Sequence, residues 1–180
     1  MTIVILCMLT ASALNSHLTL SGLTFRQATE ADQKFLLALY ATTRQDLQQL
    51  QLPPALTEHL ITMQFQAKCS GYRQQFPKAC SLIIEHANRG IGRILLDTTN
   101  TNIRLIDIAL LPDHRRQGYG RACIRALQDF AIQRNKPVQL SVHQDNIAAH
   151  TLYLALGFSP IQSTPPSLSL CWLPTGTGGL

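Results

Sequence analysis

Residues Ile106 to Leu127 read IDIALLPDHRRQGYGRACIRAL, and this stretch decides the fold. It begins as an apolar strand, passes through a Pro-containing turn into basic residues and glycines, and continues directly into an amphipathic helix. The first N–H groups of a helix lack partners within the helix, and the helix dipole places partial positive charge at the same end. A helix that begins at Gly118 or Gly120 therefore favours an anion at its start.

The side chains of this loop favour phosphate or pyrophosphate as the anion. Gly118 and Gly120 carry no side chain, so a phosphate group can approach the bare backbone. Arg115, Arg116 and Arg121 supply full positive charges beside it. A solvated basic turn before a helix has a similar sequence, so these residues by themselves leave both interpretations open.

Two common nucleotide-binding loops are excluded. The P-loop requires Gly-Lys followed by Ser or Thr, and the sequence contains no such tripeptide. The dinucleotide fingerprint requires three glycines, whereas Gly118-x-Gly120 supplies two. The remaining pattern is Arg115-x-x-Gly118-x-Gly120 between a strand and a helix. After one helix and one strand, residues 146–158 follow with the sequence NIAAHTLYLALGF.

These two stretches resemble the motifs of the GNAT superfamily of acyl-CoA-dependent N-acyltransferases. Residues 115–120 resemble its coenzyme loop, Q/R-x-x-G-x-G/A, with Arg at the first position, and residues 146–158 resemble its pattern N-x-x-A-x-x-L-Y-x-x-x-G-F. Two motifs in the right order are far more specific than either alone. The resemblance extends from about Leu23 to Trp172. It implies an N-acetyltransferase that takes acetyl-CoA as cosubstrate and needs no metal.

The resemblance implies an α/β (α+β) fold with three layers. Its centre is a mixed, mostly antiparallel sheet of six to seven strands with a splay between strands 4 and 5, flanked by about four helices. Alternating or continuous apolar runs predict strands at 23–28, 80–86, 91–97, 103–111, 138–143 and 167–172. Helical spacing predicts helices after a capping box at 29–32, over 56–71, from 118 or 120 to about 134, and over 148–156. The second of these would turn Leu56, Leu60, Met63 and Ala67 to one face.

The resemblance also implies which residues hold the coenzyme. The backbone N–H groups of Ile108, Ala109 and Leu110 on the fourth strand would serve the pantetheine arm and the thioester carbonyl. Asn146 would help to hold the coenzyme, or would cap the last helix. The diphosphate would lie on Arg115, Arg116, Gln117, Gly118, Tyr119, Gly120 and Arg121.

Two residues are candidates for catalysis. Tyr153 would be the general acid that protonates the departing thiolate, although a tyrosine at such a position in an arbitrary protein is more often a core residue with a satisfied hydroxyl. Asp107 is a candidate general base or holder of the cationic amine, and its alternative role is a strand residue paired with a nearby Arg such as Arg104. Glu85 and His143 are weaker candidates for the base.

Composition agrees with a single domain that binds a polyanion. The chain has 180 residues, 46% of them hydrophobic, and a formal net charge of +5. Lys and Arg are spread along the chain, which makes nucleic acid an unlikely partner. Five cysteines without a C-x-x-C pair and six scattered histidines predict reduced thiols, no metal site and a cytoplasmic location.

The two ends of the chain fall outside the resemblance. Residues 1–22 are an apolar extension. The apolar run within it, from Met1 to Leu14, is too short to span a membrane, and no Lys or Arg precedes it. A leader, a misplaced start, an added strand and a partner-binding arm all remain open for it. The expected domain covers 23–173, and 174–180 is expected to be a flexible tail. Many members of the family form homodimers, so the resemblance implies a possible homodimer that would form through residues 167–172 or through the extension.

The sequence does not identify the acceptor substrate. The resemblance implies a primary amine on a small molecule, a polyamine or a protein, and residues 30–78 do not identify it. Their few acidic residues weigh against a strongly cationic acceptor. The competing function is a non-catalytic acyl-CoA sensor, which the retention of Tyr153 and of the glycine loop disfavours.

Overall fold

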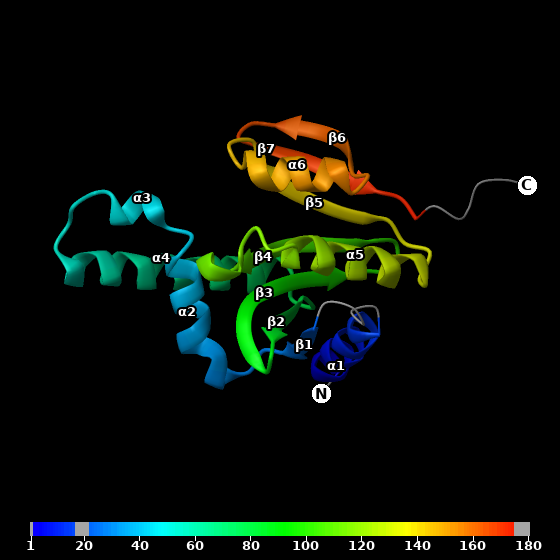
Figure 1. The fold of residues 1–180 in the computed structure, drawn as a ribbon, viewed down its shortest axis with the longest axis horizontal. Helices are drawn as coiled ribbons and strands as arrows, with labels where there is room; N and C mark the ends of the chain where they lie inside the picture. The colour runs from blue at the N-terminus through cyan, green and yellow to red at the C-terminus, as the bar shows by residue number, and fades with distance from the viewer. Residues whose placement is uncertain (1, 17–21, 175–180) are drawn as a thin grey trace, which may run out of the picture.

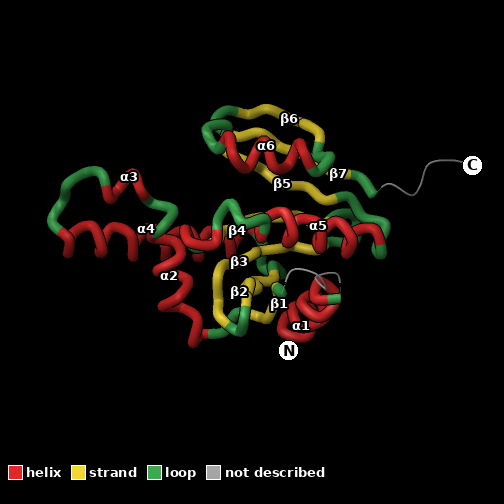
Figure 2. The backbone as a smooth tube through the Cα atoms, in the orientation of Figure 1, coloured by secondary structure: helices red, strands yellow, loops and turns green. Residues whose placement is uncertain are grey.

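The computed structural model describes residues 2–16 and 22–174. Within these ranges, seven strands form one sheet in the order β1-β2-β3-β4-β5-β7-β6 (Figures 1 and 2). Only β4 and β5 are parallel, and every other neighbouring pair is antiparallel. This confirms the mixed, mostly antiparallel sheet. The strands are β1 (Leu23–Gln27), β2 (Cys80–His86), β3 (Arg89–Thr98), β4 (Ile103–Leu110), β5 (Val138–His143), β6 (Ser159–Thr164) and β7 (Ser167–Trp172).

Helices cover both faces of the sheet and complete the three layers. The larger core joins the sheet to α1, α5 and α6, and a smaller one joins Ile83 of β2 to Leu36 of α2 and Phe65 of α4. The described residues contain six α-helices, where about four were expected, because α1 and the short α3 add to the set. The helices are α1 (Thr2–Asn15), α2 (Gln33–Ala41), α3 (Gln45–Gln48), α4 (Pro54–Gln75), α5 (Tyr119–Ile132) and α6 (Ile147–Ala155), with 3-10 turns at Glu30–Asp32 and Pro112–His114.

The apolar N-terminal stretch is a helix that packs on the sheet. Cys7, Ala11 and Leu14 of α1 are buried. At its end, Asn15 Oδ1 accepts a hydrogen bond from Phe25 N (2.6 Å), and Asn15 Nδ2 donates to Phe25 O (2.9 Å). Since β1 is an edge strand, these bonds occupy backbone groups that would otherwise be free. The described part of the extension, residues 2–16, is therefore a helix against the sheet and not an added strand.

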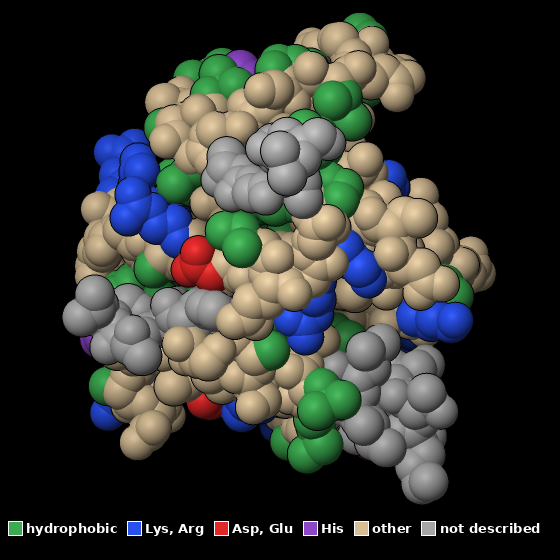
Figure 3. Space-filling model, turned by 90° about the vertical axis from the view of Figure 1, so that its right-hand side faces the viewer, with side chains coloured by type: hydrophobic (Ala, Val, Ile, Leu, Met, Phe, Trp, Pro, Cys, Tyr) green, Lys and Arg blue, Asp and Glu red, His purple; other side chains and the backbone are tan. Residues whose placement is uncertain are grey.

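The surface shows no concentrated basic patch on the face drawn in Figure 3. Lys and Arg side chains lie there in several separate groups, and Asp or Glu side chains lie between some of them. In the described ranges, no helix has both the length and the apolar character needed to cross a bilayer. Residues 175–180, expected as a flexible tail, lie outside the described residues.

Several predicted boundaries and one predicted face were wrong. The β2–β3 turn lies at Ala87 and Asn88 and not at 88–90, where it was predicted. These two residues have φ of 49° and 60°, and a two-residue hairpin turn of type I′ requires such positive values. Helix α4 continues through Gly71 to Gln75. Its buried residues are Ile61 and Phe65, whereas the predicted Leu56 and Met63 are 44% and 53% exposed. The helix has apolar residues on more than one stripe, so the sheet selects the buried one.

Strand β6 was not predicted. Every residue of Ser159–Thr164 is exposed, so the segment has no buried face to produce an alternating pattern. It exists because its backbone pairs with β7. The capping box was predicted correctly: the Asp32 carboxylate accepts hydrogen bonds from Thr29 N (2.8 Å) and Thr29 Oγ1 (3.0 Å).

A β-bulge in β4 decides which of its side chains face which layer. Leu95 of β3 pairs with Asp107, but Leu96 pairs with Leu105, so Ile106 has no opposite residue. Before the bulge, Ile103 and Leu105 face the larger core, and after it Ile108 and Leu110 pack against the same core. The inserted residue therefore turns Asp107 away from that core and toward α4.

Gly92 allows β3 to approach the end of β4 closely. It lies opposite Leu110, and a Cβ atom there would overlap Ala109 O and would approach Leu110 Cδ2 to 2.6 Å. Because one of these neighbours is backbone, the strand itself would have to move. Gly71 is different, since a Cβ atom at this helical position meets nothing within 4 Å.

We expect Gly92→Ala to destabilise the protein by about 1–3 kcal/mol, because it forces β3 and β4 apart. The matched change Gly71→Ala removes a flexible residue from a helix and should stabilise the protein by about 0.5–1 kcal/mol. Urea unfolding followed by circular dichroism measures both. Equal stability of the two variants would contradict the close approach of β3 to β4.

Candidate active site

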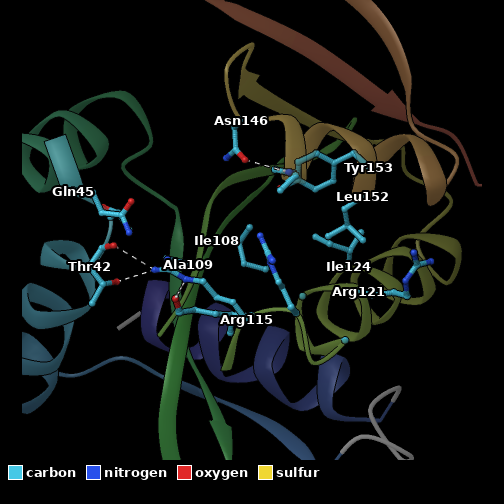
Figure 4. Close-up of a pocket in the computed structure, with 17 residues that line it drawn as sticks. Thr42, Gln45, Ile108, Ala109, Arg115, Arg121, Ile124, Asn146, Leu152 and Tyr153 are labelled. Atoms are coloured by element: carbon cyan, nitrogen blue, oxygen red, sulfur yellow. Dashed lines mark hydrogen bonds between the residues drawn. The ribbon is translucent and has the colours of Figure 1, made fainter. Parts of the chain in front are cut away.

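The sheet opens between β4 and β5. These strands pair only from Ile103 to Leu105, opposite Val138 to Leu140, and then separate, which confirms the predicted splay. A cavity of about 650 Å³ lies beyond that point, between β4, the start of α5, α6 and the residues after α2. Figure 4 shows Thr42 and Gln45 on one side of it and Leu152 and Tyr153 on the other.

The exposed edge of β4 offers backbone groups to this cavity. Leu111 N donates to Ile91 O (2.8 Å), so the backbone groups of Leu111 point toward β3. Backbone groups alternate along a strand, and therefore those of Ile108 and Leu110 point toward the cavity, while those of Ala109 point toward β3. All three residues line the cavity, and the alternation makes Ile108 and Leu110 the available donors.

The glycine loop has the backbone geometry of an anion site. Gly118 has a φ of 86°, which a residue with a side chain rarely adopts, and it precedes the first turn of α5. The first hydrogen bond of this turn runs from Ala122 N to Gly118 O (2.9 Å). The N–H groups of Tyr119, Gly120 and Arg121 precede that bond, and glycine has no side chain to cap them. Gly118 and Gly120 both line the cavity.

The arginines of the loop have different roles. Arg115 lines the cavity, but its Nε donates to Leu110 O (2.8 Å) and its Nη2 donates to Thr42 Oγ1 (2.9 Å), so it braces the loop against β4 and the end of α2 (Figure 4). Arg116 and Arg121 also line the cavity, and both are exposed to solvent. These two side chains are therefore free to reach a bound anion.

Two predicted loop residues do not line this cavity. Gln117 donates from Nε2 to Asp113 O (2.5 Å) and so folds back along the loop. The Tyr119 hydroxyl lies 3.4 Å from His86 Nε2, on the end of β2. Tyr119 is the first residue of α5, and Gln117 precedes the N-cap Gly118. The assignment of these two residues to the diphosphate stays a prediction.

The C-terminal motif forms a helix end that fixes Tyr153. Gly157 has a φ of 82°, Gly157 N donates to Leu154 O (3.0 Å), and Phe158 N donates to Tyr153 O (3.1 Å). This pair of bonds is a Schellman motif, in which the residue after the glycine contacts the residue five positions earlier. The rings of Phe158 and Tyr153 lie 5.6 Å apart. The spacing Y-x-x-x-G-F thus orients the tyrosine ring toward the sheet.

Tyr153 is buried but lines the cavity. It is 6% exposed, and no described residue forms a hydrogen bond with its hydroxyl. Burial, with a smaller contribution from the negative charge of Asp107, raises the pKa of Tyr153 to about 12. The phenol is therefore protonated at neutral pH and can donate a proton.

Asn146 caps α6. Its Oδ1 accepts a hydrogen bond from Ala149 N (3.1 Å), which confirms the capping role that the sequence left open. Asn146 also lines the cavity, so the cap lies beside the coenzyme site that the sequence predicted for it.

Asp107 lines a smaller cavity of about 220 Å³. The two cavities share Thr43, Ile108, Ala109 and Asn146. Lys68 Nζ of α4 donates to the Asp107 carboxylate at 3.3 Å, and Arg93 Nη1 of β3 lies 3.9 Å from it.

The predicted ion pairing of Asp107 with a nearby Arg is therefore present, but the Arg is Arg93 rather than the suggested Arg104. The Arg104 guanidinium lies 5.7 Å from the centre of the Phe76 ring instead. The weaker candidates for the base line neither cavity: Glu85 pairs with Arg26 (2.7 Å), and exposed His143 pairs with Asp145 (3.4 Å).

Sequence reasoning missed several residues of the two cavities. Thr42, Thr43 and Gln45 follow α2, where no sequence motif marks them. Lys68 lies on the buried stripe of α4, three positions after Phe65 and seven after Ile61, and this helical spacing could have placed it next to the sheet. No sequence pattern marks Arg93 of β3 as a cavity residue, because charged residues are common on strands with one exposed face.

Comparisons with known proteins agree with this geometry. A family model described as the acetyltransferase (GNAT) family matches residues 44–158. Among curated proteins, none matches this chain.

Solved structures of similar fold include acetyltransferases. One is a paia N-acetyltransferase from Thermoplasma acidophilum in complex with coenzyme A, with a TM-score of 0.63, 15% identity, and coverage of 84% of this chain and 98% of the other. Another is the ribosomal-protein-S18-alanine N-acetyltransferase from Escherichia coli, with a TM-score of 0.58, 21% identity, and coverage of 87% of this chain and 96% of the other. A third is the spermidine N-acetyltransferase from Vibrio cholerae in complex with CoA and spermine, with a TM-score of 0.60, 18% identity, and coverage of 86% of this chain and 97% of the other.

We expect Gly118→Ala to weaken the binding of coenzyme A by about tenfold, because the left-handed conformation costs a residue with a side chain roughly 1–2 kcal/mol and the loop would relax away from it. Isothermal titration calorimetry measures the dissociation constant. Gly22→Ala is a matched control, since Gly22 also has a positive φ (62°) but lies outside both cavities. Unchanged affinity in Gly118→Ala would refute the anion site.

Proposed function

Given that this chain belongs to the acetyltransferase (GNAT) family, we propose that it moves an acetyl group from acetyl-CoA to a primary amine by direct attack within a ternary complex. The observation that carries this proposal is the convergence of three features on one cavity. These are the N-terminus of α5, the open edge of β4 and the hydroxyl-bearing ring of Tyr153. Each suits a different part of an acylated coenzyme.

The start of α5 suits the diphosphate of the coenzyme. Its free N–H groups and the helix dipole attract anions, and the exposed side chains of Arg116 and Arg121 add full charges. The edge of β4 that β5 leaves open suits the amide-containing pantetheine arm, because extended backbone and amide groups pair as strands do. The cavity connects both places.

Direct transfer requires three kinds of assistance. The amine nitrogen attacks the carbonyl carbon, negative charge develops on the carbonyl oxygen, and the carbon–sulfur bond breaks to release a thiolate. In this proposal, the N–H group of Ile108 or Leu110 stabilises the oxygen. Tyr153, protonated at neutral pH, donates its proton to the sulfur.

Asp107 is assigned to the acceptor amine. Among the residues that line the two cavities, it carries the one carboxylate. It lines the smaller cavity and is the chain neighbour of Ile108, which lines both, so an ammonium group bound to it would lie near the thioester. Asp107 then takes the amine proton, directly or through water, before attack.

Thiol release tests the function. The purified protein, incubated with acetyl-CoA and a panel of primary amines, should release free coenzyme A in an amine-dependent manner, which a thiol-reactive dye detects. Mass spectrometry should find the acetylated amine in equal amount. Tight binding of coenzyme A with no turnover of any amine would favour the acyl-CoA sensor instead.

Tyr153→Phe should lower kcat by about 10²-fold, because the variant keeps the ring and loses the proton donor. The dissociation constant for coenzyme A should stay within about twofold of the wild-type value, since the ring contact with Phe158 remains. Steady-state kinetics and calorimetry measure the two quantities. A variant with full kcat would remove the acid role from Tyr153.

A further inference from the structure

The smaller cavity has one apolar wall and one charged wall. Leu36 and Leu39 of α2 and Phe65 of α4 form the apolar wall, and Lys68, Arg93 and Asp107 form the charged one. Its volume of about 220 Å³ is the space of roughly seven water molecules at 30 Å³ each. It therefore suits a small molecule, or one small part of a molecule, with both an apolar and an ionic group.

The charged wall contains two cations and one anion. The side chain of Arg93 is 12% exposed, and that of Lys68 is 33% exposed. Burial alone would lower the pKa of Lys68. The negative charge of Asp107, with smaller contributions from other neighbours, has a larger opposite effect, so the pKa of Lys68 is raised. Lys68 is thus an ammonium group at neutral pH. With one carboxylate between them, the two cations leave a net positive charge in a partly buried place.

Lys68 and Arg93 are held where they are by their neighbours. Lys68 Nζ lies 5.5 Å from the ring centres of both Tyr40 and Tyr72, within range of cation–π attraction. Arg93 Nε donates to Ser81 Oγ (3.1 Å). Their positions are therefore set before any ligand binds, which reduces the entropy lost on binding.

We propose that the acceptor is an amine that also carries a carboxylate and an apolar side chain, that is, an apolar α-amino acid. This proposal rests on the function proposed above. The ammonium group lies on Asp107, the carboxylate lies on Lys68 and Arg93, and the apolar side chain lies on Leu36, Leu39 and Phe65. Alternating charges on the wall match the two charges of the zwitterion.

The same charges disfavour a polyamine. An additional ammonium group in this cavity would meet Lys68 or Arg93 at close range, and like charges in a partly buried site repel strongly. A neutral amine would leave the surplus cation without a partner. The zwitterion avoids both costs.

Asp107 precedes Ile108 and Ala109, which line both cavities, and this position brings an amine bound to it near the thioester. The ammonium nitrogen first gives one proton to Asp107, and the neutral amine forms the new bond to the acetyl carbon. The carbon–sulfur bond breaks, Tyr153 gives its proton to the sulfur, and the second proton that the nitrogen loses as the amide forms restores the Tyr153 phenol, while Asp107 releases its proton to solvent. The products are an N-acetyl amino acid and coenzyme A. No additional reactant is required.

A matched set of acceptors tests the proposal. L-leucine, L-leucinamide and isoamylamine share one side chain and one amine, but only L-leucine has a carboxylate, and spermidine adds a polycation. With the full chain and acetyl-CoA, we expect kcat/KM for L-leucine to exceed that for each of the others by about tenfold or more. A higher value for L-leucinamide, isoamylamine or spermidine overturns the proposal.

Substitutions identify the residues responsible. Arg93→Met and Lys68→Met should each lower the ratio of kcat/KM for L-leucine to kcat/KM for isoamylamine about tenfold, because only L-leucine has a carboxylate to lose. Both side chains also lie beside Asp107, and any effect on that carboxylate is common to the two amines and cancels in the ratio. Either variant suffices if the other does not fold. Arg104→Met is the control, since Arg104 lies on β4 outside both cavities. Equal losses for both amines in the Met variants would overturn the proposed carboxylate site.

Calorimetry separates this proposal from the function on which it rests. If coenzyme A binds and amines other than L-leucine are preferred, the acyltransferase stands and the zwitterion proposal falls. If coenzyme A does not bind, both fall. If coenzyme A binds but no acceptor reacts, L-leucine should still bind the coenzyme A complex more tightly than L-leucinamide does, and its failure to do so overturns the proposal.

Discussion

The pairing of β4 with β5 stops after three residues, and the rest of the site depends on this interruption. Backbone N–H and C=O groups that lose a strand partner must find another polar partner or remain in water. Arg115 satisfies Leu110 O, while the N–H groups of Ile108 and Leu110 face the cavity. The splay therefore creates a place that an amide- and carbonyl-bearing ligand can complete.

The two helix ends beside the splay use opposite features of helix termini. At the start of α5, Gly118 leaves the first N–H groups uncapped, which favours an anion. At the end of α6, Gly157 allows the last carbonyl groups to be satisfied within the chain, and the closing contact between Phe158 and Tyr153 fixes the tyrosine ring. Glycine at a positive φ thus leaves one terminus open for a ligand and closes the other to position a side chain.

The bulge at Ile106 connects these features to the acceptor side. Without the extra residue, the side chain of Asp107 would face the larger core, where an unpaired carboxylate is costly. With it, Asp107 meets Lys68 and Arg93 on the α4 face, while Ile108 and Leu110 still pack toward α5. One inserted residue therefore places a charged group and two backbone donors on the same short segment.

The sequence by itself determined the features that depend on near neighbours in the chain. The two glycine motifs, the buried stripe of α5 and the alternation of β5 follow from local periodicity and from the φ that glycine allows. The tertiary structure alone decided the buried face of α4, the existence of β6, and the pairing of Asp107 with Lys68 rather than Arg104. The buried face of α4 depends on which surface the helix meets, and β6 depends on backbone pairing without a hydrophobic pattern. The partners of Asp107 depend on a bulge of one residue that turns its side chain to the other face of the sheet. None of these causes leaves a periodic signal in the sequence.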